Sequence, residues 1–171
     1  MEMILERIGD FMTAGGDVLK LIFVVTLAMW TLILERAWYF RLQLPKQVES
    51  VMERWRSRED QVSWHAQQIR DLMISETSVE LNRYLPMIAT LVAVCPLLGL
   101  LGTVTGMIEV FDVMAAAGNS NPRAMASGVT KATIPTMSGL LAALSGLYFS
   151  VQLKRFAQHK TDNLSEQLIH D

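Results

Sequence analysis

The sequence lacks most of what enzymes and metalloproteins use. Its 171 residues include one cysteine, Cys95, which cannot form an internal disulfide or a metal cluster. Its three histidines, His65, His159 and His170, lie far apart and outside the apolar stretches, without metal-ligand spacing. No glycine-rich phosphate-binding motif and no nucleophile-elbow motif occurs. We therefore expect no enzymatic activity, no cofactor and no metal site.

Charge is also scarce. Asp, Glu, Lys and Arg make up 19% of the residues, whereas an average soluble domain has about 25%. The 15 Lys and Arg do not exceed the 17 Asp and Glu, so there is no basic excess to hold the phosphates of a nucleic acid. Hydrophobic residues reach 51%, which excludes a disordered tail. The composition favours a small membrane protein.

The apolar residues are concentrated in three stretches. Residues 84–108 and 132–153 contain no charged residue and no histidine. At about 1.5 Å rise per residue, each run can cross the roughly 30 Å hydrocarbon core of a bilayer. A third run, residues 21–34, is shorter, but Lys20 can snorkel outwards and aromatic residues follow at 38–40. We predict an all-α polytopic membrane protein with transmembrane helices at 18–40, 84–111 and 131–153.

The positive charges predict the orientation of these helices. One side of the predicted spans holds 4 of the Lys and Arg residues and the other side holds 11. Because cytoplasmic segments carry the excess of positive charge, the N-terminus is expected outside and the C-terminus inside.

The connecting segments follow from this topology. Residues 41–83 have apolar residues at helical spacing and a break near residues 57–60, which predicts a cytoplasmic helical hairpin that packs on itself and on neighbouring subunits. Residues 112–130 contain a turn cluster at 118–122, which predicts an external loop. Residues 154–171 are expected to continue the third helix as a fraying cytoplasmic tail. Residues 1–17 hold four acids and one base, which predicts an external amphipathic segment and not a signal peptide.

Small residues form a smooth face on each of the two long spans. Such faces let membrane helices approach closely, and hydroxyl groups can bond across the contact. We interpret these small residues as helix-packing residues: Gly99, Gly102 and Gly106 on the second span, and Gly139, Ala142, Ala143 and Gly146 on the third.

Three threonines, Thr103, Thr133 and Thr136, lie beside these faces. Their hydroxyls could serve helix packing alone, or they could line a pore or relay a proton, and the residues themselves leave both alternatives open. Neither long span has a carboxylate or histidine in its interior. If the protein conducts protons, the group that titrates must therefore come from a partner chain.

Two blocks of sequence resemble a known family. Residues 93–107 read A-V-C-P-L-L-G-L-L-G-T-V-T-G-M and residues 128–143 read G-V-T-K-A-T-I-P-T-M-S-G-L-L-A-A. Together with L-I-L-E-R at 32–36, they resemble the ExbB/TolQ/MotA proton-channel family, and most of all ExbB of a second-type TonB system. The resemblance implies a homopentamer in the bacterial inner membrane around an ExbD-like single-span partner, whose membrane aspartate carries the proton.

The resemblance also implies roles for individual residues. Thr103 and Thr136 match the threonines of the family's proton path, and Thr133 would extend that surface. Glu35 and Arg36 match the pair at the cytoplasmic end of the first helix. Lys131 departs from the family, in which many relatives have a glutamate, so the role of that glutamate cannot be transferred.

The function implied by the resemblance is a motor subunit. It would couple the proton-motive force, through a TonB-like protein, to import of ferric siderophores, haem or vitamin B12 across the outer membrane. Two alternatives remain at this point: a TolQ-like role in envelope constriction, and a non-conducting membrane scaffold.

Overall fold

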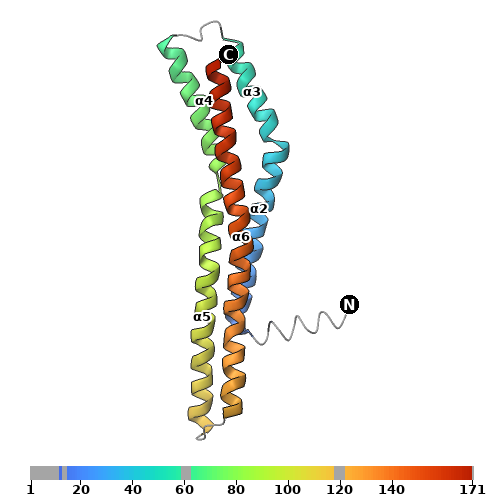
Figure 1. Cartoon of the computed structure of the whole chain (residues 1–171), viewed down its shortest axis with the longest axis vertical. Helices are drawn as coiled ribbons and strands as arrows, with labels where there is room; N and C mark the ends of the chain where they lie inside the picture. The colour runs from blue at the N-terminus through green and yellow to red at the C-terminus, as the bar shows by residue number, and fades with distance from the viewer. Residues whose placement is uncertain (1–11, 13–14, 59–62, 118–121, 171) are drawn as a thin grey trace, which may run out of the picture. The chain divides into compact units, whose positions relative to one another are not determined.

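The computed structural model describes residues 12, 15–58, 63–117 and 122–170 (Figure 1). All regular secondary structure in these segments is α-helical. The helices are α2 (Gly16–Leu42), α3 (Leu44–Arg56), α4 (Trp64–Asn82), α5 (Leu85–Ala117) and α6 (Pro122–His170). The predicted all-α class is confirmed.

Three helical segments are long and apolar enough to cross a membrane. They lie within Gly16–Leu42, Trp64–Ala116 and Gly128–Leu168. Many large apolar side chains on them are exposed, which suits a lipid or protein environment better than water: Leu27, Leu34, Leu97, Leu100, Val104, Met137, Leu141 and Leu144. The three predicted membrane helices are therefore confirmed as structural elements.

The helices extend further than the sequence predicted. The segment 112–130 was expected to be a loop, but α5 continues to Ala117 and α6 begins at Pro122. Alanine is the strongest helix former, and the run 115–117 is all alanine. Residues 154–171, which were expected to continue the third helix, do so up to His170 as part of one 49-residue helix. The predicted N-terminal segment lies outside the described residues except at residues 12 and 15–17.

The chain forms two compact units, and each can be described by itself. The first comprises Met1–Trp30 and Ala89–Leu147. It brings together parts of α2, α5 and α6. Its buried side chains come from all three: Leu19, Ile22 and Met29 from α2, Val92 and Cys95 from α5, and Ala132 and Ala143 from α6. The core of this unit thus consists of apolar and small residues, as helix packing within a membrane requires.

The second unit comprises Thr31–Ile88 and Tyr148–Asp171. Here α3, α4 and the end of α6 run side by side (Figure 1). Their apolar faces meet in one cluster: Val51 and Trp55 of α3, Ala66 of α4, and Leu164 and Leu168 of α6. The predicted hairpin is therefore present as α3 and α4. The end of α6 packs against both as a third helix.

Local sequence explains where the two hairpin helices begin and end. Pro45 lies in the first turn of α3, where a missing backbone N–H is tolerated. Ser63 caps α4, because its hydroxyl oxygen accepts a hydrogen bond from the Ala66 N–H at 3.3 Å. The break predicted near residues 57–60 falls between Arg56 and Trp64.

Candidate functional site

The small residues of α5 lie directly against α6. A Cβ atom added at Gly99 would lie 3.0 Å from the Thr136 Cα, and one added at Gly106 would lie 2.7 Å from the Ala132 Cβ. A Cβ at Gly102 would overlap the Pro135 ring. The three glycines therefore allow the two helices to approach more closely than any side chain would permit.

The small residues of α6 make the same kind of contact. A Cβ at Gly139 would lie 2.5 Å from the Cys95 carbonyl oxygen of α5. A Cβ at Gly146 would overlap the Met29 side chain of α2. Ala143 is buried and Ala142 is half-buried on the same helix. The structure thus places most of the predicted packing residues where helices meet.

Thr136 joins the two helices by a hydrogen bond. Its hydroxyl donates to the Gly99 carbonyl oxygen at 2.7 Å, across 37 residues of sequence. The side chain is half-buried. Because the hydroxyl proton is already donated, Thr136 can still accept a hydrogen bond from a further donor but cannot offer one without leaving Gly99.

The other two threonines bond within their own helices. The Thr103 hydroxyl donates to the Leu100 carbonyl at 2.7 Å, and the Thr133 hydroxyl donates to the Thr130 carbonyl at 2.8 Å. Thr103 is half-buried and Thr133 is exposed. Neither makes a hydrogen bond to Thr136. Within one chain the three hydroxyls therefore do not form a continuous relay, and each keeps lone pairs that a donor from outside could use.

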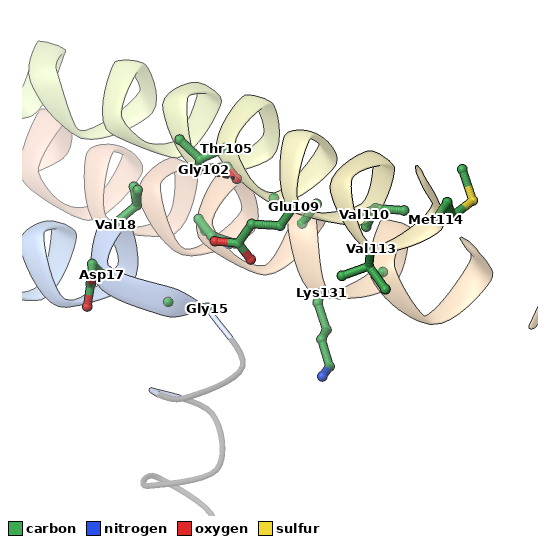
Figure 2. Close-up of a pocket in the computed structure, with 15 residues that line it drawn as sticks. Gly15, Asp17, Val18, Gly102, Thr105, Glu109, Val110, Val113, Met114 and Lys131 are labelled. Atoms are coloured by element: carbon green, nitrogen blue, oxygen red, sulfur yellow. Dashed lines mark hydrogen bonds between the residues drawn. The ribbon is translucent and has the colours of Figure 1, made fainter. Parts of the chain in front are cut away.

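A cavity of about 610 Å³ lies between the start of α2, the C-terminal half of α5 and the start of α6 (Figure 2). Its charged lining residues are Asp17, Glu109 and Lys131. The Asp17 carboxylate accepts from the Lys20 ammonium at 2.7 Å, and that contact lowers the pKa of Asp17. Neither Glu109 nor Lys131 has an ion-pair partner in the part of the chain that the structure describes.

In the second unit, the Arg36 side chain makes a separate group of polar and aromatic contacts. Its side chain is only 3% exposed and its Nε lies 3.3 Å from the Glu35 carboxylate. The guanidinium donates to the Glu80 carbonyl oxygen at 3.2 Å and lies over the rings of Tyr39 and Tyr84, 5.0 and 4.8 Å from their centroids. Tyr84 itself has a φ of 64°, a strained value for a residue with a side chain. Arg36 therefore stabilises the junction at which α4 ends and α5 begins.

A match to a family model identifies the family of this chain. The model of the MotA/TolQ/ExbB proton channel family matches residues 41–166. The chain belongs to this family. The match covers the hairpin, the second and third apolar segments and the helix that follows, so it includes the small-residue contact and all three threonines.

Individual members of the MotA/TolQ/ExbB family agree with this assignment. The chain is 26% identical to the biopolymer transport protein named ExbB-like 3 of Synechocystis sp., over 84% of this chain and 86% of that protein. It is 33% identical to the biopolymer transport protein exbB1 of Vibrio cholerae over 57% of this chain and 43% of that protein. It is 32% identical to the Tol-Pal system protein TolQ of Haemophilus influenzae over 43% of this chain and 32% of that protein. The chain thus spans less than half the length of the last two.

In a member of a proton channel family, the distribution of titratable residues along the spans bears on how a proton could cross the membrane. A proton path through a membrane needs a group that can take up and release the proton. The uncharged runs 84–108 and 132–153 contain hydroxyls, the Cys95 thiol and the Gln152 amide, but no carboxylate and no histidine. Groups of three or more potential metal ligands are likewise absent from the described residues. The two runs therefore supply hydrogen-bonding groups, among them the hydroxyls of Thr103, Thr133 and Thr136, but no carboxylate.

Proposed function

We propose that this chain is an ExbB-type motor subunit that couples the proton-motive force to work done by a partner protein. The observation that carries the proposal is the combination of threonine hydroxyls with carboxylate-free spans in a member of a proton channel family. Thr103 and Thr136 would line the path, with Thr133 extending it. The titrating group would be an aspartate in the membrane helix of an ExbD-like single-span partner.

The state of the Thr136 hydroxyl suggests how it would act on such a partner. Since its proton is donated to Gly99, its oxygen is available as an acceptor. A protonated aspartic acid can donate to that oxygen, whereas an ionised carboxylate cannot, so the contact favours the neutral acid. Loss of the proton would therefore weaken the attachment of the partner helix at this position. A change in attachment that follows protonation is what a motor needs in order to move its partner.

We further propose the following assembly. Several copies, five by resemblance to the family, would surround the partner helices in the inner membrane of a bacterium. The N-terminus would be periplasmic and the C-terminus cytoplasmic, as the uneven distribution of Lys and Arg supports. The work would go through a TonB-like protein to import across the outer membrane.

A TolQ-type output is the second candidate, and the similarity to the Haemophilus influenzae TolQ supports it. The mechanism at the threonines would be the same, but the work would go to constriction of the envelope. The two candidates differ in the phenotype of a deletion strain. A TonB-type subunit is required for growth on a ferric siderophore, and a TolQ-type subunit is required for an intact envelope during division.

The experiment is complementation of a deletion strain on a ferric siderophore as the only iron source. We expect rescue by the wild-type chain and by Thr136→Ser, and failure of Thr136→Val at equal protein level in the membrane. Thr130→Val is the matched control, because Thr130 is an exposed threonine of α6 whose hydroxyl donates within its own helix, to Ala126 at 2.9 Å. Equal rescue by Thr136→Val would favour a scaffold without a proton path, and an envelope defect without an iron defect would favour the TolQ-type output.

A further inference from the structure

The cavity between α2, α5 and α6 has a cation and an anion on facing helices that no described residue neutralises. Figure 2 shows the Glu109 side chain extending from α5 into the space beside the start of α2. Lys131 extends from α6, and its ammonium points away from the Glu109 carboxylate. The third charged residue, Asp17, is already paired with Lys20. The cavity therefore presents one free charge of each sign to an occupant.

The helices α5 and α6 are in close contact along one wall of this cavity. Gly102 contacts Pro135 and Gly106 contacts Ala132 so tightly that a single Cβ on either glycine would clash. The hydrogen bond from Thr136 to Gly99 lies beyond this contact along both helices. The close contact of α5 with α6 thus lies between the cavity and the hydrogen bond of Thr136 along the two helices.

The position of the cavity relative to the bilayer follows from the sequence. Glu109 directly follows the uncharged run 84–108, and Lys131 directly precedes the uncharged run 132–153. Both charges therefore lie where hydrocarbon gives way to the polar region of a bilayer. The remaining walls are largely apolar, with Val110, Val113 and Met114 among them.

We propose that this pocket binds a zwitterionic phospholipid whose headgroup carries a primary ammonium. The Lys131 ammonium would bind the lipid phosphate, and the Glu109 carboxylate would accept hydrogen bonds from the lipid ammonium. The acyl chains would cover the apolar wall formed by Val110 and Val113. One molecule with adjacent opposite charges and an attached apolar part satisfies all three features, whereas a purely anionic lipid would leave Glu109 facing a like charge.

The test is a lipid titration of the purified, delipidated full-length protein in detergent, followed by native mass spectrometry. Phosphatidylethanolamine should bind about tenfold more tightly than phosphatidylglycerol, as expected for one charge-assisted hydrogen-bonded contact. Glu109→Gln should abolish this preference, and Lys131→Gln should weaken binding of both lipids. The double exchange Glu109→Lys with Lys131→Glu should retain the preference, because the pocket again offers one charge of each sign.

Two variants serve as matched controls. Asp112→Asn removes an exposed carboxylate of α5 that does not line the cavity, and Lys154→Gln removes an exposed ammonium of α6 far along the helix from it. Both should bind the two lipids as the wild type does. Equal binding of both lipids by the wild type, or an unchanged preference in Glu109→Gln, would overturn the proposal. So would competition by free O-phosphoethanolamine as effective as that of the lipid, since it would show that no acyl chain is bound.

Discussion

At the scale of single residues, the Thr136 hydroxyl has two properties that substitution can keep or remove together. Its hydroxyl donates to the Gly99 carbonyl, and its oxygen can accept from a partner. Thr136→Ser keeps both properties and Thr136→Val loses both. Loss of the hydrogen bond to Gly99 should destabilise the α5–α6 contact by about 1 kcal/mol.

The stability effect of Thr136→Val can be measured by thermal unfolding of the purified protein in detergent. We expect a lower unfolding temperature for Thr136→Val and a value close to wild type for Thr136→Ser. If the valine variant unfolds like the wild type but fails to support growth, the hydroxyl acts mainly on the partner. An equally low unfolding temperature for the serine variant would contradict the assigned hydrogen bond.

The glycines at the helix contact allow a graded prediction. At Gly139 an added Cβ would lie 2.5 Å from the Cys95 backbone oxygen, and at Gly99 it would lie 3.0 Å from the Thr136 Cα. Gly139→Ala should therefore cost about 1–3 kcal/mol through overpacking. Gly99→Ala should cost less, because the overlap is smaller. The helix propensity that alanine gains over glycine, about 1 kcal/mol, offsets part of the cost at both positions.

Chemical unfolding of both glycine variants, in the same detergent, would rank the two contacts. The order expected is wild type, Gly99→Ala, then Gly139→Ala as the least stable. The reverse order of the two variants would show that α5 and α6 adjust more easily at Gly139 than the structure indicates.

At the scale of elements, the junction between α4 and α5 depends on Arg36. Its guanidinium bonds to the last turn of α4 and stacks on Tyr84, whose backbone is strained. Arg36→Met should leave the Glu80 carbonyl without this donor and remove the ring contacts, at a cost of about 2–4 kcal/mol. Arg83→Ala is the matched control, since Arg83 also lies over Tyr84 but is exposed, and it should cost less than about 1 kcal/mol.

Hydrogen exchange would locate the effect of these arginine changes. We expect faster exchange at residues 80–88 in Arg36→Met and little change in Arg83→Ala. Equal exchange in both variants would mean that the exposed Arg83 stabilises the junction as much as the buried Arg36 does.

The helical elements could largely be predicted from apolar run length and periodicity. The three spans follow from runs too long for a core of this size, and the hairpin follows from helical spacing with a polar break. The helical extensions into the segment 112–130 were missed, because turn residues at 118–122 marked a loop without fixing how far the helices reach into it. The glycine stripes indicated contact faces, but the structure is needed to show that Gly102 contacts Pro135.

The candidate site was less accessible to sequence reasoning. Thr103, Thr133 and Thr136 were identified by composition and by resemblance, but not the carbonyls to which they donate, because those contacts depend on how the helices rotate about their axes. Arg36 was identified only by resemblance, and its partners Glu80 and Tyr84 lie more than 40 residues away. The sequence did not indicate a role for Glu109, because nothing in one helix shows that a cation on another helix lines the same cavity.

At the scale of the whole molecule, the topology makes a prediction that needs no partner. In a Cys95→Ala background, and with the proposed location in the inner membrane, Ser57→Cys should react with a membrane-impermeant thiol reagent only after that membrane is opened. Ala126→Cys should react once the reagent reaches the periplasm. Both positions are exposed in the structure, so accessibility depends on the side of the membrane. The reverse labelling pattern would refute the orientation inferred from Lys and Arg.

The central claim is that the chain conducts protons only together with a partner that supplies a carboxylate. The most direct measurement is proton uptake by vesicles that contain the chain with and without the proposed ExbD-like single-span partner, under an imposed pH gradient. We predict uptake by the pair, none by the chain alone, and at least a tenfold loss in the pair with Thr103→Val, roughly the worth of one transition-state hydrogen bond. Equal uptake by the chain alone, or undiminished uptake with Thr103→Val, would contradict the account.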